Sequence, residues 1–389
     1  MTYNFDKIID RRNTYSMKYD PASRGKPDDV IPLWVADMDF TAPPCVLDAI
    51  AEQTRHGIFG YFNTADDYSR MLQNWFSRRH NWHIEPKWLV KTPGVVSAIH
   101  VALLTFTEPG DSVIIQQPVY YPFMSAVSST GRQLVVNQLI QKNGYYEIDF
   151  DDFEQKIKTG SVKAFVLCNP HNPVGRVFTR EELMRLGDIC IRHNVIVIAD
   201  EIHQDFIYEG HEHLVFAGLD SRLGDITVTC TAPTKTFNLA ALPVANIFVE
   251  NERLRKLFMQ KNAMFGVTQI GVMEIVACVA AYEHGETWLS ELLRYLSENM
   301  KLIDEFLKSN LPEIKFTKPE GTYLAWLDFR ALGLSDSALD DMVTHEAKLW
   351  LHRGSTFGAS GDGFMRLNAA CPRSVLQKAL EQLEEAVRR

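Results

Sequence analysis

The sequence lacks long apolar segments, blocks of positive charge and closely spaced pairs of cysteines. No apolar run approaches the roughly 20 residues that a helix needs to cross a bilayer, so we expect no membrane span. Residues 1–12 contain no apolar core behind a basic start, which predicts the absence of a signal peptide. Lys and Arg total 40 against 49 Asp and Glu, a net charge of −9. Nucleic acids and anionic membranes are therefore not expected partners.

The cysteines are few and scattered along the chain. None belongs to a Cys-x-x-Cys pair, and the six are Cys45, Cys168, Cys190, Cys230, Cys278 and Cys371. In a chain of this length without an export signal, such a pattern indicates reduced thiols rather than disulfides or a zinc site. We therefore predict a cytoplasmic protein that holds no metal.

Four short apolar runs dominate the first part of the chain, at residues 111–115, 163–168, 194–199 and 226–230. Each run ends in a polar or Gly/Pro-rich turn, and helical patterns such as 179–193 lie between them. This alternation is typical of an α/β fold with a mainly parallel sheet that is covered on both faces. Ligands bind such sheets beyond the carboxyl ends of the strands, where these polar clusters lie. We therefore expect the functional residues to lie together along one edge of the sheet.

The last hundred residues have a different pattern. Helix-period apolar positions occur at 291–307 and 374–387, and short strands are indicated at 322–328 and 364–368. The chain has 389 residues, of which 46% are hydrophobic, and this length allows one large core and a smaller lobe. We predict a large domain at 46–289 and a small α/β domain formed by 1–45 and 290–389.

Two charged residues directly follow predicted strands. Lys235 lies in the segment 231–238, Thr-Ala-Pro-Thr-Lys-Thr-Phe-Asn. It is either a surface charge or an amine whose surroundings lower its pKa and suit it to form an imine. Asp200 comes directly after the run 194–199. Its carboxylate could cap a helix, bind a metal, or pair with a protonated ring nitrogen and so keep the ring cationic, as a carbanion sink requires.

Polar residues near the ends of other predicted strands also have both a structural and a functional interpretation. Asn172 lies in a segment with two Asn-Pro steps, 169–175, which is either a rigid turn or a donor to a phenolate oxygen. A helical pattern starts after Gly94, and the free N–H groups of a helix N-terminus bind phosphate. Tyr120 either stacks on a flat ring or packs in the core. Arg366, inside an apolar strand, needs an anion, which is either a structural carboxylate or that of a substrate.

Taken together and in this order, these residues resemble the class I/II aminotransferase superfamily, the pyridoxal 5′-phosphate (PLP) enzymes of fold type I. The resemblance covers nearly the whole chain. Residues 32–40, 57–61, 200–203 and 234–239 are similar to the MalY/PatB branch of cystathionine β-lyases, which are C–S lyases. The resemblance implies a large domain with a mainly parallel seven-stranded sheet covered by helices, a smaller α/β domain, and a homodimer with shared active sites.

The resemblance also implies roles for single residues. Lys235 would hold PLP through an imine, Asp200 would pair with its pyridine nitrogen, Asn172 would bond O3′ and Tyr120 would stack on the ring. The phosphate would be held by the amides after Gly94, at Val95 and Val96, together with Thr234 and with Tyr61 of the neighbouring subunit. Arg366 would clamp the substrate α-carboxylate, with Asn172 and Tyr61 beside the substrate.

Three positions depart from the usual aminotransferase pattern. His203 replaces the tyrosine that usually follows the ring-pairing aspartate by three residues, as in the lyase branch. Pro243 replaces an arginine that often binds the phosphate, and Ala232 replaces a hydroxyl residue. Binding of the phosphate is therefore expected to depend more on Thr234, the helix N-terminus after Gly94 and Tyr61.

The implied activity is α,β-elimination of L-cystathionine and other cysteine S-conjugates to a thiol, pyruvate and ammonia. In this scheme Lys235 takes the Cα proton, Asp200 keeps the ring protonated, and Lys235 or a nearby tyrosine such as Tyr120 protonates the departing sulfur. Two alternatives remain open: a PLP-dependent aminotransferase, and a regulatory protein that uses the same fold to bind a partner. A nicotinamide enzyme is not expected, because no Gly-x-Gly-x-x-Gly follows the candidate strands.

Overall fold

A computed structural model describes residues 2–64, 66–266 and 269–389. Its largest sheet has seven strands in the order β2-β10-β9-β8-β7-β3-β4. The strands span Leu89–Thr92 (β2), Ala245–Phe248 (β10), Thr227–Thr231 (β9), Ile196–Asp200 (β8), Val162–Cys168 (β7), Ser112–Gln117 (β3) and Gln133–Gln138 (β4). Neighbouring strands are parallel except β10, which runs antiparallel to both β2 and β9. The prediction of an α/β fold with a mainly parallel seven-stranded sheet is confirmed.

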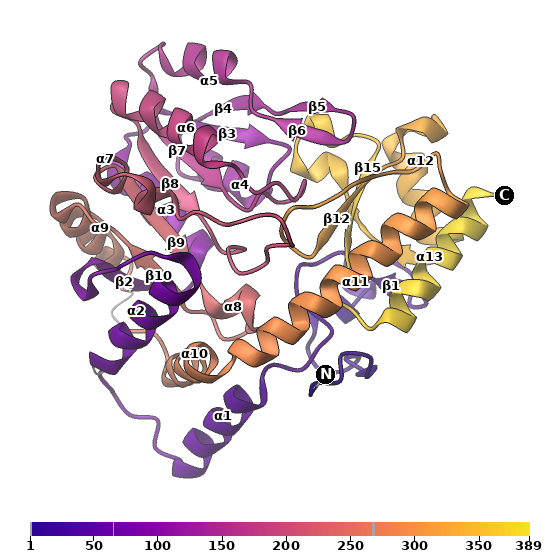
Figure 1. The fold of residues 1–389 in the computed structure, drawn as a ribbon, viewed down its shortest axis with the longest axis horizontal. Coiled ribbons are helices and arrows are strands. Elements are labelled where there is room, and N and C mark those ends of the chain that lie inside the picture. Colours follow the sequence, from indigo (N-terminus) through magenta and orange to yellow (C-terminus); the bar gives the residue numbers. More distant parts are fainter. Residues whose placement is uncertain (1, 65, 267–268) are drawn as a thin grey trace.

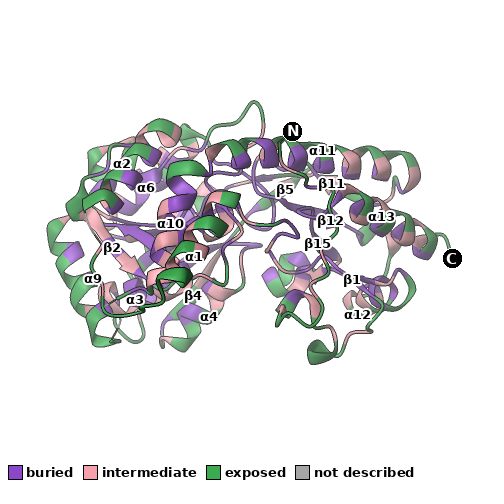
Figure 2. Ribbon diagram, turned by 90° about the horizontal axis from the view of Figure 1, so that it is seen from below, coloured by how far each residue is buried: buried purple, intermediate pink, exposed green. Residues whose placement is uncertain are grey.

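Helices cover both faces of this sheet because successive strand residues point to opposite sides. In β7, Ala164 and Val166 pack into the cluster that contains α3 and α9, whereas Phe165 and Leu167 pack into the cluster that contains α5 and α6. Figure 2 shows the buried residues concentrated along the strands, with exposed residues on the outer sides of the helices. The covering helices are α3 (Val95–Phe106), α4 (Pro122–Ser129), α5 (Phe150–Ile157), α6 (Arg180–Arg192), α7 (Ser221–Gly224) and α9 (Glu252–Met264).

A second, antiparallel sheet carries the C-terminal part of the chain, in the order β11-β12-β15-β14. Its strands span Lys315–Thr317 (β11), Leu324–Asp328 (β12), Phe364–Asn368 (β15) and His352–Arg353 (β14). Two helices pack on it, α11 (Glu286–Asn310) and α13 (Arg373–Val387). The N-terminal segment joins this region through β1 (Ile31–Pro32), which pairs in parallel with β13 (Leu349–Trp350). The predicted helices and strands of the last hundred residues are confirmed.

One long helix connects the two sheet regions. In Figure 1, α11 runs from the neighbourhood of α8 and α10 to the C-terminal region beside α13. The predicted domain boundary at 289/290 falls within this helix, and the division into domains stays a prediction. The remaining elements are α1 (Pro44–His56), α2 (Asp66–His80), α8 (Pro233–Thr236), α10 (Val272–His284), α12 (Asp336–Asp341) and the hairpin β5–β6 (Ile140–Lys142, Tyr145–Glu147). Within the described ranges, no helix is both long and apolar enough to cross a membrane.

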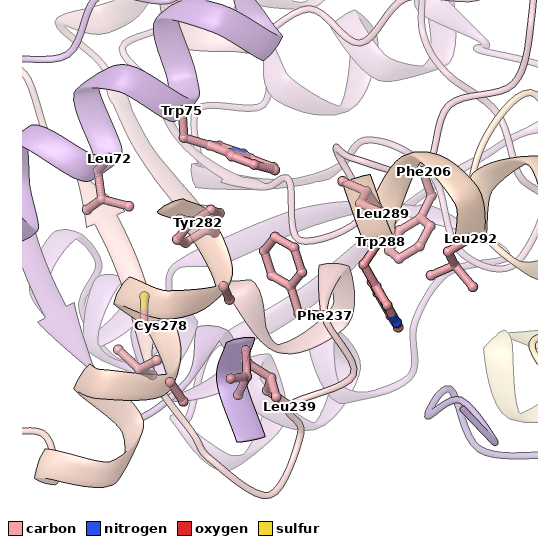
Figure 3. Close-up of a cluster of buried hydrophobic side chains, with 14 of the residues drawn as sticks. Leu72, Trp75, Phe206, Phe237, Leu239, Cys278, Tyr282, Trp288, Leu289 and Leu292 are labelled. Carbon is pink, nitrogen blue, oxygen red and sulfur yellow. The ribbon is translucent and has the colours of Figure 1, made fainter. Parts of the chain in front are cut away.

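Aromatic residues from the helices α2, α10 and α11 pack together with one from the turn that follows α8. Trp75 on α2 lies 5.6 Å from Phe237, which follows α8, and 5.0 Å from Tyr282 on α10, measured between ring centroids. Trp288 on α11 lies beside Phe237 in the same cluster (Figure 3). Because Phe237 is only two residues from Lys235, this cluster fixes the backbone that carries the lysine.

Replacing Trp75 with alanine is expected to lower the free energy of unfolding by about 3–5 kcal/mol, because it removes a fully buried indole and leaves a cavity. Urea unfolding with a constant m-value measures the change. Leu257→Ala, at an exposed position on α9, is the control and should cost about 0.5 kcal/mol or less. Equal losses in the two variants would contradict the assigned role of the cluster.

Candidate active site

The carboxyl ends of β3, β7, β8 and β9 converge on a cavity of about 560 Å³. Every residue predicted for the site lines this cavity except Tyr61: Gly94, Val95, Val96, Tyr120, Asn172, Asp200, His203, Thr234, Lys235 and Arg366. The N-terminal segment closes one side through Trp34, Val35 and Ala36. The expectation that the polar clusters meet at one edge of the sheet is therefore confirmed.

Lys235 is a buried amine in this cavity. It lies on α8, one turn beyond the end of β9, and its Nζ donates a hydrogen bond of 2.7 Å to the carbonyl oxygen of Ala36. Burial lowers the pKa of Lys235 to about 8. An amine with this pKa is partly neutral near physiological pH, and the neutral form is the one that attacks an aldehyde or accepts a proton.

This lowered pKa predicts a pH dependence for the attachment of an aldehyde to Lys235. The rate of covalent attachment of PLP to the cofactor-free protein should rise with pH up to about 8 and level off above it, since Lys235 is neutral above its pKa. The absorbance change on adding PLP measures this rate. A rate that still rises tenfold per unit between pH 9 and 10 is the behaviour of an ordinary lysine and would contradict the assignment.

Asp200 ends β8 inside the cavity wall. Its Oδ1 accepts a hydrogen bond of 3.1 Å from the Ile202 amide, and burial raises the pKa of this carboxyl to about 7. It is the one carboxylate among the described residues that line the cavity. A cationic partner at this point would favour the ionised form of Asp200. In the part of the chain that the structure describes, no three His, Cys, Asp or Glu side chains form a metal-binding group.

Arg366 lies opposite, on β15 of the second sheet, and is fully buried. Its Nη1 donates to Asn172 Oδ1 at 3.0 Å, and its Nη2 donates to the carbonyl oxygen of Trp34 at 2.7 Å. His352 Nδ1 lies 3.3 Å from the same Nη2, and burial, followed by the charge of Arg366, lowers the pKa of His352 to about 3. His352 is therefore neutral beside the guanidinium.

No described carboxylate forms an ion pair with Arg366, and its Nε has no hydrogen-bond partner. Burial lowers the pKa of Arg366 to about 10, so the group stays charged at neutral pH. A buried, charged guanidinium without a counterion favours binding of an anion. Of the two alternatives considered above, a structural carboxylate is not found among the described residues, and the binding of a ligand's carboxylate by Arg366 stays a prediction.

The N-terminus of α3 also lines the cavity. Gly94 has φ 138°, and a Cβ at this position would meet nothing within 4 Å, so the backbone angle rather than space favours glycine here. The amide of Ala98 makes the first intrahelical bond, to Gly94 O, which leaves the preceding N–H groups of the helix free. Thr234 lines the same cavity. These donors suit a phosphate group.

Three predicted residues complete the description. Burial raises the pKa of Tyr120 to about 12, so its hydroxyl keeps its proton at neutral pH. Burial, with the charges of Lys235 and Arg366, lowers the pKa of His203 well below its usual value, and no described residue bonds its Nδ1. Tyr61 is fully exposed and does not line the cavity. Its role in a neighbouring subunit stays a prediction.

Sequence reasoning missed several residues that line the cavity, among them Trp34, Ala36, Tyr121 and His352. The segment 32–40 supported the resemblance, but no role was assigned to its backbone carbonyls. His352 gave no signal in the sequence, because it reaches the site through the pairing of β14 with β15, opposite Arg366.

This chain is similar to known proteins over nearly its whole length. The family model of aminotransferase class I and II matches residues 28–383. This chain belongs to that family. It is 42% identical to the cystathionine beta-lyase PatB of Bacillus subtilis, over 99% of this chain and all of the relative. It is similar to the structure of cystalysin from Treponema denticola, which contains PLP, with a TM-score of 0.97 and 37% identity over 100% of this chain and 99% of that one. It is also similar to the PLP-bound C–S lyase of Staphylococcus hominis, with a TM-score of 0.94 and 34% identity over 100% and 99% of the two chains.

The cofactor of this family member is PLP, and the cavity fits it. Three of its groups would meet those of the cofactor: the free N–H groups at α3 would donate to the phosphate, the Asp200 carboxylate would accept from the protonated ring nitrogen, and the buried amine of Lys235 would react with the aldehyde. Pro243 lines the cavity where an arginine often stands in the family, and proline donates no hydrogen bond.

Proposed function

We propose that this chain is a PLP-dependent C–S β-lyase that converts L-cystathionine and other cysteine S-conjugates, with water, to a thiol, pyruvate and ammonia. The observation that carries the proposal is a single cavity with two groups in it: the Lys235 amine of lowered pKa, and the Arg366 guanidinium that lacks a counterion. An α-amino acid has a carboxylate that Arg366 can bind and a Cα proton that Lys235 can remove.

Arg366 binds the substrate α-carboxylate, and Asn172 assists it indirectly. Because Asn172 Oδ1 already accepts from Arg366, its Nδ2 protons point to other acceptors, and we assign them to O3′ of the cofactor. The same bond ties the carboxylate site to the cofactor site. A substrate held by Arg366 is therefore oriented relative to the ring before any bond breaks.

Lys235 would remove the Cα proton, since an amine with a pKa of about 8 suits a base at neutral pH. When bound, PLP supplies a conjugated ring that accepts the electron pair left on Cα. Asp200 keeps the ring nitrogen protonated, which strengthens this electron sink. The electron pair then forms the Cα–Cβ double bond as the Cβ–S bond breaks.

The departing sulfur needs a proton, and the cavity offers two donors. Tyr120 carries a hydroxyl that stays protonated at neutral pH, and Lys235 holds the proton that it took from Cα. Hydrolysis of the remaining three-carbon unit releases pyruvate and ammonia. The elimination is redox-neutral and needs no acceptor.

We also propose a homodimer in which Tyr61 reaches the partner's active site. Ile58, Phe59 and Tyr61 are exposed in one chain, within a short segment that a second copy would cover. The mass in solution tests this. A cytoplasmic location is likewise proposed, on the support of six cysteines that are all free thiols.

The test of the proposed reaction is product analysis with purified protein, PLP and L-cystathionine. Equal amounts of homocysteine and pyruvate are expected without any added 2-oxo acid, and S-alkyl cysteines should release their thiols as well. Amino-group transfer that requires a 2-oxo acid, without release of a thiol, would instead assign the aminotransferase activity.

A further inference from the structure

The mouth of the cavity carries a second arginine, Arg24, which the mechanism does not use. Arg24 ends a short helical turn, Ala22–Arg24, and lines the same cavity as Lys235 and Arg366. It is exposed, and its Cζ lies 5.7 Å from the ring centre of Trp34, whose backbone carbonyl accepts from Arg366. Trp34 therefore contacts both arginines, one through its ring and one through its backbone.

The segment that carries Arg24 is anchored on both sides by ion pairs. Lys18 has a fully buried side chain and lies 2.9 Å from Asp39. On the other side, Lys26 Nζ lies 3.0 Å from Asp340. These contacts hold the turn in place, so the position of Arg24 at the mouth is a property of the fold.

Arg24 differs from Lys18 and Lys26 on either side of it because it has no described carboxylate partner. Arg11, Arg12, Lys18 and Lys26 each form an ion pair, whereas Arg24 forms none with any residue that the structure describes. Its recorded hydrogen bond is a weak one, 3.7 Å to the sulfur of Met17. Four further residues of the cavity lining carry no negative charge: Met17, Trp34, His352 and Thr356.

We propose that Arg24 binds a carboxylate at the far end of the substrate's leaving arm, so that the enzyme prefers thioethers whose thiol product is an acid. The argument rests on the proposed function. Arg366 takes the α-carboxylate and the N-terminus of α3 takes the cofactor phosphate, which leaves Arg24 as the cation of the cavity without an assigned anion. L-Cystathionine carries such a terminal carboxylate, whereas simple S-alkyl cysteines do not.

A matched pair of substrates tests this: S-(2-carboxyethyl)-L-cysteine and S-(2-carbamoylethyl)-L-cysteine, which differ in the charge of the arm and hardly in its size. In the wild-type holoenzyme, kcat/KM is expected to favour the carboxylate by about fivefold, the upper range for an exposed ion pair. Arg24→Gln should bring this ratio to about one, with the change in KM rather than kcat, and Arg24→Lys should restore part of it. Salt at 0.5 M should lower the wild-type ratio, since it screens an exposed pair.

Arg180→Gln is the matched control, because Arg180 is exposed at the start of α6 and removal of its charge changes the net charge equally. It should keep the wild-type ratio. The same ratio in Arg24→Gln as in the wild type would overturn the inference. So would turnover of L-cystathionine without turnover of the carboxyethyl compound. Failure of the wild type to release a thiol from any of these substrates would overturn the proposed function, and the inference with it.

Discussion

Lys235→Ala is expected to lower kcat for thiol release by about 10⁴-fold or more, because the variant loses both the covalent attachment of PLP and the base that removes the Cα proton. The loss should persist at saturating PLP, since added cofactor restores binding but not the base. Pyruvate release, followed with lactate dehydrogenase, measures the rate. The absorbance of PLP bound to the variant should be that of the free aldehyde.

Lys163→Ala is the control for this experiment. Lys163 is an exposed lysine on β7 whose Nζ donates to the carbonyl oxygen of Gly160 and to no other group in the described part of the chain, so its removal should leave kcat within about twofold of the wild type. Thiol release by Lys235→Ala at a tenth of the wild-type rate or faster would contradict the role assigned to Lys235.

Arg366→Lys is expected to lower kcat/KM about 100-fold, mostly through KM. A lysine keeps the positive charge but loses the planar pair of donors that meets both oxygens of a carboxylate. It also loses the bond from Nη1 to Asn172 Oδ1. Asn172 then rotates more freely, and kcat should fall several-fold as well. Initial rates over a range of L-cystathionine concentrations separate the two effects.

Arg373→Lys is the control for this experiment, because Arg373 is on α13, which packs on the sheet that carries Arg366. Arg373 pairs with Glu298 on the surface, at 2.6 Å, and does not line the cavity. Its conservative replacement should leave both KM and kcat within about twofold of the wild type. If Arg366→Lys behaves in the same way, Arg366 is a structural residue and the carboxylate binds elsewhere.

The strands that could be predicted from the sequence are those whose side chains are buried on both faces of the sheet. β3, β8 and β9 are interior strands whose residues are almost all buried, and each is followed by a polar cluster. β4 lies at an edge and is partly exposed, so its pattern is weaker. β2 and β10 are four-residue strands, too short for periodicity to distinguish from loops.

The same logic explains which part of the site was predictable. Asp200, Lys235 and Asn172 follow strand ends in the sequence, and the parallel sheet alone brings them together. Trp34 and His352 come from segments that reach the cavity only through the pairing of β1 with β13 and of β14 with β15. No local pattern encodes such contacts. The chemistry of a buried arginine predicted an anion for Arg366 but left the source of that anion open. Coordinates were needed to find that no described carboxylate pairs with it, and its role as the clamp of the substrate carboxylate stays a prediction.

The most direct test of the account is the number of pyruvate molecules formed per active site without an added 2-oxo acid, with lactate dehydrogenase removing the pyruvate as it forms. A β-lyase returns its cofactor to the aldehyde form in every cycle. We therefore predict many turnovers per site on L-cystathionine, with homocysteine and pyruvate in equal amounts. Conversion of at most one equivalent of L-cystathionine per site to its 2-oxo acid, with no pyruvate or homocysteine and with the cofactor left in the amine form, would identify an aminotransferase and contradict the proposed elimination.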